Sequence, residues 1–545
     1  MTLLSASATA AGPVLAQTRS LQPPSIDYAA LTPLLIVLGA ACLSVLVEAF
    51  LPRHQRWPVQ VTLGVVAIGG AGAALGLYAG GAPEGTTTLA GALAVDRPTV
   101  FLWGTLLVLG LASVLLIADR SVEPGGAFIP SAAGRAGAEE RASRTATLVT
   151  TGPGDSAGRV DQPAPMQTEV ITFALFALGG MMTFVAANDL LTMFVALEVL
   201  SLPLYLMCGL ARRRRLLSQE AAVKYFLLGA FASAFFLYGL ALIYGYAGSV
   251  GFTEIAEASA GTTRSDTLLF GGLALLVVGL LFKGSVGPFH AWTPDVYQGA
   301  PTPVTAFMAA CTKVAAFGAI LRVLQVAFAD TRWEWRGVLW AVAIASMLIG
   351  AILGLTQTDI KRMIAYSSIA HAGFLLLGAM AIGPEGIAST LFYLLAYGFT
   401  TLAVFGAISL VRTADGEATH LSQWAGLARR SPVLAAVMTF LLLALAGIPL
   451  TSGFTAKFAV FSAALGDGMA PLVVVALVAS AIAAFFYLRV VVLMYFSEPA
   501  ADGPAVTVPG AFTTAAITLG VIVTLLLGIV PTLALDWAGG GGFVG

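Results

Sequence analysis

Long apolar runs separated by short polar stretches dominate the chain. A membrane-spanning helix needs about 20 predominantly apolar residues, and fourteen runs come close to that length. They lie at 29–51, 58–80, 98–118, 168–187, 190–211, 221–246, 267–290, 303–326, 337–356, 363–382, 386–411, 432–465, 470–496 and 509–535. The pattern predicts an all-α polytopic membrane protein with about fourteen transmembrane helices.

One polar interruption is much longer than the others. Residues 119–167 are rich in Gly, Ala, Ser, Thr, Arg and Glu, and a segment of this composition cannot bury a core. We therefore expect a flexible cytoplasmic loop there. It follows an N-terminal tail and three helices (1–118), and it precedes two sets of five helices (168–326 and 337–496) and a last helix with a C-terminal tail (509–545).

Basic residues are distributed unevenly between the loops. The loops after odd-numbered runs hold sixteen arginines and lysines, whereas the other loops and the N-terminal tail hold five. Cytoplasmic loops of membrane proteins carry the excess of basic residues. The distribution predicts that the odd-numbered loops lie in the cytoplasm and that both termini are outside. The excess of arginine over lysine and the many alanines and glycines indicate a GC-rich bacterium, so we expect its plasma membrane as the location.

The composition excludes several other classes of protein. Of the 545 residues 58% are hydrophobic and 10% are charged, whereas soluble domains carry about 25% charged residues. A net charge of −1 excludes a protein that binds nucleic acid through bulk positive charge. Three cysteines, Cys42, Cys208 and Cys311, are too widely separated for a zinc, iron–sulfur or disulfide pattern. We expect no cofactor in this chain.

Charged residues inside the apolar runs are the candidate functional groups. Four of the five lysines and one glutamate lie there, and they are Glu198, Lys224, Lys283, Lys313 and Lys457. Each charge at the centre of a spanning helix costs about 2.5–3.5 kcal/mol on insertion scales. A single one could be a structural ion pair or a residue that extends to the membrane surface. Because lysine, unlike arginine, can release its proton when buried, the set favours a proton relay.

Two of the predicted helices contain helix breakers next to a charged residue. Helix 7 has two glycines and a proline between Lys283 and His290, and helix 12 has Gly447, Pro449 and Gly453 before Lys457. Non-helical backbone at membrane depth persists only where it lines a cavity or is buried in protein. Each break falls in the fourth helix of a set of five, which predicts two inverted five-helix repeats with broken helices 7 and 12.

The remaining titratable groups inside the spans have less specific signals. His290 follows Lys283 by seven residues, and we favour a relay role over simple packing for it. We expect His371 to pack between helices or to form a minor polar bridge. Arg322 and Arg489 lie toward helix ends, so we expect them to pair locally or to extend to the membrane surface.

The segment Lys283-Gly-Ser-Val-Gly-Pro-Phe-His290-Ala-Trp-Thr-Pro-Asp-Val-Tyr-Gln-Gly-Ala-Pro resembles the signature of the antiporter-like membrane subunits of respiratory complex I. The resemblance extends over about 168–496. The Thr-Pro-Asp-Val-Tyr form is most similar to the N branch of that family, whose mitochondrial counterpart is NADH dehydrogenase subunit 2. A lysine at 457 is unlike the M branch, which usually has glutamate there, and no long lateral helix of the L branch follows the last span.

The resemblance implies a fourteen-helix subunit of a proton-pumping membrane arm. It assigns roles to six residues: the acid of helix 5 (Glu198), its ion-pair partner (Lys224), the central lysine (Lys283), two bridging residues (His290 and Lys313) and the residue of broken helix 12 (Lys457). It also implies the antiporter-like M subunit and the small K and J subunits as partners, together with the lipid bilayer, protons and internal water. NADH, flavin, iron–sulfur clusters and quinone would belong to partner subunits.

The function predicted from the sequence is proton translocation coupled to electron transfer from NADH to quinone in other subunits. The enzyme would be the whole translocase, with no redox chemistry in this chain. One alternative is a subunit of an Mrp-type cation/proton antiporter, which has the same charged helices. The other alternative is a non-conducting structural spacer of the membrane arm, which the complete set of buried charges disfavours.

Overall fold

The computed structural model describes residues 26–81, 85–123, 126–128, 167–211, 214–261, 266–413, 416–499 and 503–544. Its first helices are α1 (Tyr28–Phe50), α2 (Arg53–Gly80), α3 (Arg97–Ala118), α5 (Glu169–Ala186), α6 (Leu190–Cys208), α7 (Arg215–Ala247), α8 (Phe252–Gly261) and α9 (Asp266–Lys283). The helices that follow are α10 (Trp292–Gly299), α11 (Thr302–Phe307), α12 (Lys313–Arg322), α13 (Arg332–Thr356), α14 (Ile360–Met380), α15 (Pro384–Ser409), α16 (Leu427–Arg430), α17 (Pro432–Ala446), α18 (Ser452–Gly466), α19 (Ala470–Phe496), α20 (Ala511–Ile529) and α21 (Thr532–Gly539).

Short turns and strands connect these helices. Two π-helical turns, η1 (Met308–Thr312) and η2 (Val323–Ala327), flank α12, and η3 (Leu421–Trp424) is a 3-10 turn. The strands β1 (Thr86–Thr88) and β2 (Leu93–Val95) form one antiparallel pair. The strands β3 (Val411–Thr413), β4 (Gly416–Glu417) and β5 (Ala505–Val506) form a small sheet in the order β4-β3-β5.

The described residues contain thirteen helices that are long and apolar enough to cross a membrane. The stretch from α11 to η2 counts as one of them, Thr302–Ala327. The predicted run at 432–465 is divided between the shorter helices α17 and α18. The prediction of an all-α polytopic membrane protein is therefore confirmed.

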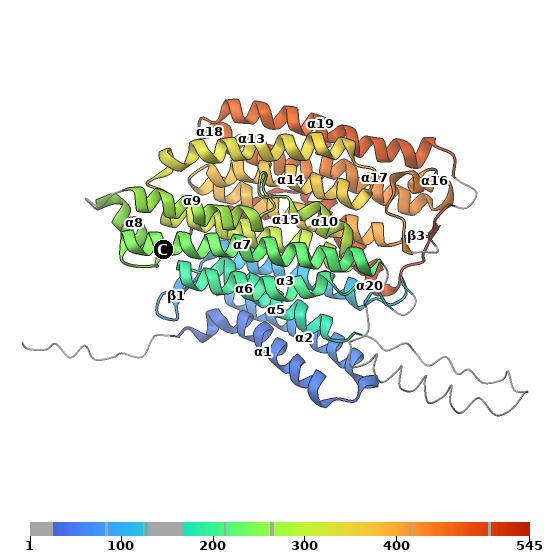
Figure 1. The fold of residues 1–545 in the computed structure, drawn as a ribbon, viewed down its shortest axis with the longest axis horizontal. Helices are drawn as coiled ribbons and strands as arrows, with labels where there is room; N and C mark the ends of the chain where they lie inside the picture. The colour runs from blue at the N-terminus through green and yellow to red at the C-terminus, as the bar shows by residue number, and fades with distance from the viewer. Residues whose placement is uncertain are drawn as a thin grey trace, which may run out of the picture.

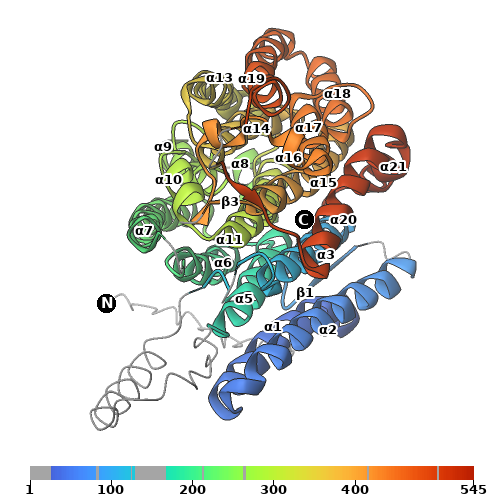
Figure 2. The ribbon, with the colours of Figure 1, turned by 90° about the vertical axis from the view of Figure 1, so that its right-hand side faces the viewer.

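The helices run side by side along one direction (Figure 1). Seen toward one end of the bundle, α1 and α2 lie at one edge, α13 and α19 lie at the opposite edge, and α15 lies between them (Figure 2). The most apolar windows of Thr302–Ala327 and Ile360–Met380 are 100% buried, whereas that of Arg215–Ala247 is 33% buried. Side chains such as Phe226 and Phe231 on α7 are exposed, as expected of an apolar face that meets lipid.

The loops after odd-numbered runs meet at one end of the bundle. The Arg120 guanidinium lies 4.7 Å from the centre of the Trp57 ring, and Arg412 pairs with Glu123 at 3.1 Å. These contacts join loops that are far apart in the sequence, and β3 marks the same end (Figure 2). We call this end of the bundle the basic face.

The first residues of the predicted 119–167 loop are packed against the bundle. The Asp119 carboxylate accepts a hydrogen bond from the Thr513 backbone N–H at 2.9 Å, and Phe128 forms an isolated β-bridge with Ala211. These contacts give the polar segment partners that its composition does not reveal. Residues 129–166, on which most of the prediction rests, lie outside the described residues.

The two predicted interruptions of helices are present. The α9 helix ends at Lys283 and α10 begins at Trp292, while α17 and α18 are separated by residues 447–451. Gly447 has a φ of +88°, and a Cβ atom there would lie 3.0 Å from Lys457 Cδ. Only glycine adopts this conformation readily and leaves room for the lysine stem. The inverted relation between the two sets of helices stays a prediction.

Arg322 is held inside the bundle and does not extend to the membrane surface. Its exposed fraction is 0% and that of Asp96 is 1%, and their side chains pair at 2.8 Å. The guanidinium also donates to Thr99 Oγ1 at 2.6 Å and to the Val185 carbonyl at 3.1 Å. This is local pairing, one of the two predicted arrangements, with a partner at the N-cap of α3 that the sequence did not indicate.

Replacing Asp96 with alanine should strongly destabilise the protein, because it leaves the buried Arg322 charge without its counter-ion. Removal of one partner from such a pair costs about 3–5 kcal/mol. The measurement is the thermal midpoint of the detergent-solubilised protein together with its amount in the membrane. The double variant Asp96→Leu/Arg322→Met should recover much of the loss, because apolar packing replaces a buried pair at little cost. An Asp96→Ala protein as stable as the wild type would contradict this account.

Candidate functional site

Three of the predicted site lysines are buried where the helices are irregular. Lys283 ends α9, Lys313 directly follows the π-helical turn η1, and Lys457 lies in α18 just after the interruption. Their exposed fractions are 3%, 2% and 6%. In the part of the chain that the structure describes, no carboxylate lies within ion-pair distance of any of them. Their partners are instead hydroxyl groups, backbone carbonyls and aromatic rings.

Lys283 is held by side chains of α6 and α7. Its Nζ donates to Ser201 Oγ at 2.8 Å and to the Tyr225 hydroxyl at 3.1 Å. It also lies 5.8 Å from the centre of the Tyr205 ring. Hydroxyl oxygens and ring faces stabilise an ammonium group without neutralising it, so the amine keeps the ability to exchange its proton.

Lys313 faces α14 and α15. Its Nζ donates to the Ser368 backbone carbonyl at 2.8 Å, and it lies 5.7 Å from the centre of the Tyr397 ring. The Ser368 hydroxyl itself is buried and has no hydrogen-bond partner. Buried polar atoms of this kind are the usual partners of internal water.

His371 lies between Lys313 and Lys457. Its ring centre is 5.1 Å from that of Tyr397, which Lys313 also approaches, and 5.7 Å from that of Phe374. Lys457 Nζ lies 5.2 Å from the same Phe374 ring. His371 thus shares one aromatic neighbour with each lysine.

Both nitrogens of the His371 ring have hydroxyl partners. Hydrogen bonds join Nδ1 to the Tyr393 hydroxyl at 2.7 Å and Nε2 to the Tyr487 hydroxyl at 3.4 Å. The sequence predicts only packing or a minor polar bridge for His371. The partners lie on α15 and α19, distant in the sequence, so the hydroxyl-rich stretch around His371 was the only signal available.

Lys457 is bound by the open end of α17. Its Nζ donates to the Leu445 carbonyl at 3.1 Å, to the Ala446 carbonyl at 2.8 Å and to Ser480 Oγ at 2.9 Å. The last carbonyls of a helix have no partner within it and attract a cation. The interruption of helix 12 therefore creates the site that holds this lysine.

His290 does not reach the neighbouring lysines. No hydrogen bond or ion pair joins it to Lys283 or Lys313 among the described residues, and its Nδ1 is buried without a partner. Its nearest ring is that of Tyr366, 6.4 Å away between centres. The helix stops at Lys283, so the regular spacing of two helical turns does not exist. A bridging role for His290 stays a prediction.

The expected ion pair between Glu198 and Lys224 is absent, which corrects the sequence analysis. Glu198 accepts a hydrogen bond from Ser233, whereas Lys224 pairs with Asp295 at 2.6 Å and Glu220 at 2.7 Å. Ser233 follows Lys224 by nine residues on α7, which is about 13 Å along a helix. The two expected partners therefore point to different depths of the bundle.

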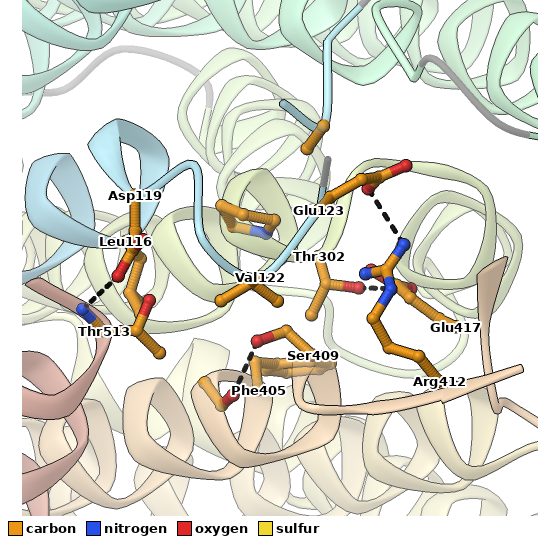
Figure 3. Close-up of a pocket in the computed structure, with 13 residues that line it drawn as sticks. Leu116, Asp119, Val122, Glu123, Thr302, Phe405, Ser409, Arg412, Glu417 and Thr513 are labelled. Carbon is orange, nitrogen blue, oxygen red and sulfur yellow. Dashed lines mark hydrogen bonds and ion pairs between the residues drawn. The ribbon is translucent and has the colours of Figure 1, made fainter. Parts of the chain in front are cut away.

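Two small cavities lie under the basic face, with volumes of about 20 and 40 Å³. Spaces of this size hold one or two water molecules. Figure 3 shows the first, where Arg412 points toward Glu123 and Thr302 toward Glu417. Lys361 pairs with Glu417 at 3.4 Å.

The charge of Glu417 is stabilised by its neighbours. Burial acts to raise its pKa, but the Lys361 ammonium, the Thr302 hydroxyl and the Arg412 guanidinium together hold that pKa below its usual value. Glu417 is therefore ionised at neutral pH. The described residues contain no group of three His, Cys, Asp or Glu side chains that could hold a metal ion.

Comparisons with known proteins identify relatives of this chain. A family described as "NADH:quinone oxidoreductase/Mrp antiporter, TM" matches residues 187–503. NADH-quinone oxidoreductase subunit N of Saccharopolyspora erythraea is 74% identical over 96% of this chain and 99% of the relative. The subunit N of Mycobacterium tuberculosis is 51% identical over 95% of this chain and 98% of the relative.

Solved structures give the same result. A chain of respiratory complex I from Thermus thermophilus superposes with a TM-score of 0.72 and 32% identity, covering 93% of this chain and all of that chain. A chain of the Mrp complex from Dietzia sp. superposes with a TM-score of 0.76 at 23% identity, covering 93% of this chain and 96% of that chain. The second likeness shows the fold alone. The protein belongs to the family of NADH-quinone oxidoreductase subunit N, antiporter-like membrane subunits of respiratory complex I.

Proposed function

We propose that this chain transfers protons across the membrane and couples that transfer to electron transfer from NADH to quinone in partner subunits of complex I. The observation that carries the proposal is the set of three buried lysines, Lys283, Lys313 and Lys457, each held by neutral partners. Buried ionisable groups inside a membrane bundle mark ion pathways. We further propose the M, K and J subunits as its neighbours in the membrane arm.

The relay runs from the first set of helices to the second. Lys283 gives its proton toward Lys313, with internal water bridging the stretch where no side-chain hydrogen bond joins them. His371 takes the proton from the side of Lys313, because it can accept at one ring nitrogen while it donates at the other. Lys457 receives it next and releases it toward Ser480, which is half-buried on α19.

The direction of transfer follows from the proposed orientation. Basic loops face the cytoplasm, so the basic face is the cytoplasmic side and both termini are outside. The water-sized cavities beside Glu417 and Glu123 lie on the side from which protons would enter. A bacterial plasma membrane is the corresponding location.

The two alternatives have less support. An Mrp-type antiporter shares the fold, but the 74% identical relative is named for NADH-quinone oxidoreductase. A non-conducting spacer would gain nothing from three buried lysines, because apolar packing replaces buried charge at little cost. Copurification of the chain with iron–sulfur subunits supports complex I, and copurification with antiporter subunits alone contradicts it.

Replacing Lys283 with alanine should abolish or strongly reduce proton pumping and coupled NADH oxidation, because it removes the first buried base. Lys283→Arg should recover little, since a guanidinium does not release its proton. The measurement is the ratio of protons to electrons in membranes that contain equal amounts of assembled complex. A Lys283→Ala complex that pumps at the wild-type ratio would refute the relay.

Replacing Glu198 with glutamine should reduce coupling, because it removes the only carboxylate near the middle of α6 while keeping the hydrogen bond from Ser233. Glu198→Asp should retain part of the activity. Proton pumping at a matched rate of electron transfer is the measurement. Wild-type coupling in Glu198→Gln would show that the charge of Glu198 has no part in proton pumping.

The structure predicts different results for the two histidines. His371→Leu should reduce proton pumping by about a hundredfold or more, because a positioned proton-transfer group typically contributes about 10²–10⁴-fold to the rate of its step. His290→Leu is the matched control and should reduce it less, because His290 contacts neither lysine. The proton-to-electron ratio of both complexes is measured side by side. A larger loss for His290 would restore it as the bridging residue.

A further inference from the structure

A carboxylate outside the predicted relay joins the two sets of helices. Asp295, on α10, pairs through one oxygen with Lys224 of α7 at 2.6 Å and through the other with Arg362 at the start of α14, also at 2.6 Å. The Arg362 guanidinium also donates to Gln298 Oε1 at 3.1 Å. One side chain thus connects a helix of the first set, the broken helix and a helix of the second set.

The α14 helix carries the groups that approach the second and third lysines. Ser368, whose carbonyl binds Lys313, and His371 follow Arg362 by six and nine residues. Asp359 caps this helix and also accepts from Gln298 at 3.0 Å. The N-terminus of α14 is therefore fixed to α10 at several points, and its surroundings depend on the charges around Asp295.

Lys224 is more exposed than the other site lysines. Its side chain is 41% exposed, whereas the Lys283 residue is 3% exposed. It is bound to two carboxylates near the start of α7, while Glu198 is engaged farther along by Ser233. A flexible ammonium on a four-carbon stem can leave its counter-ion, and the exposure of the Lys224 side chain leaves it room to do so.

We propose that Asp295 is a positioning residue, the counter-ion that Lys224 and Arg362 share, and that it transmits a change at Lys224 to α14 through Arg362. This inference rests on the proposed proton transfer. When Lys224 is bound, Asp295 shares its charge between two cations. When Lys224 leaves, the carboxylate is neutralised by Arg362 alone, and the field at the N-terminus of α14 becomes more negative. A change of charge in the first set of helices thereby alters the electric field at α14, the helix whose Ser368 carbonyl binds Lys313.

The test uses Asp295→Asn in the full complex, because asparagine keeps the size of the side chain and removes its charge. The expected loss in protons pumped per electron is about fivefold or more, the lower end of coupling between two linked sites. Glu220→Gln is the matched control, since Glu220 also pairs with Lys224 at 2.7 Å but lies on the same helix and is 55% exposed. It should pump at nearly the wild-type ratio. Asp295→Glu should recover part of the loss.

The losses of proton pumping in single and double variants distinguish this role from a merely structural one. If Asp295 acts through Lys224, the double variant Lys224→Ala/Asp295→Asn should be no worse than Lys224→Ala alone. If Asp295→Asn does not assemble, Arg362→Gln takes its place, with the same expected loss and the same comparison.

Each result bears on the inference. Wild-type pumping by an assembled Asp295→Asn complex, an equal loss in Glu220→Gln, or additive losses in the double variant would overturn it. If Lys283→Ala also pumps normally, the proposed function fails as well. If Lys283→Ala is inactive while Asp295→Asn is normal, only this inference fails.

Discussion

Charges buried in a membrane bundle need polar partners from the bundle itself, and the rest of this structure is arranged around that requirement. An uninterrupted helix uses its own carbonyls and offers few to a neighbour. The break between α17 and α18 exposes the Leu445 and Ala446 carbonyls to Lys457. This interruption thus stabilises Lys457, and without the lysine it would leave unpaired backbone groups in an apolar interior.

The same constraint separates two kinds of buried charge. Arg322 and Asp96 form a closed pair with a full set of hydrogen bonds, and such a pair fixes α12 against α3. Lys283 and Lys313 have only neutral partners, so no carboxylate holds their protons in place. We infer that the first arrangement serves stability and the second serves proton transfer.

The partners of the buried and charged side chains also determine which contacts connect the two sets of helices. Aromatic and hydroxyl groups around His371 connect the surroundings of Lys313 and Lys457. The bridge from Lys224 through Asp295 to Arg362 connects α7 to α14. Both connections end on α14, a helix whose spanning window is buried throughout, so this helix is the part of the fold through which we expect the two sets to influence each other.

The sequence by itself determined the class of the protein, the two interruptions and the number of spans, apart from the division of helix 12 into two short helices. It also indicated that Lys283, Lys313 and Lys457 are buried, but not that Lys361 is buried and Lys224 is 41% exposed. Apolar length, helix breakers and charge inside apolar runs are local properties, and each can be recognised in one segment. Tertiary structure alone decided which groups meet. Lys224 pairs with Asp295 and Glu220 and not with Glu198. His371 rather than His290 lies beside Lys313 and Lys457. These outcomes depend on the packing of helices that are distant in the sequence, and on the direction in which the backbone leaves a broken helix, which no local pattern encodes.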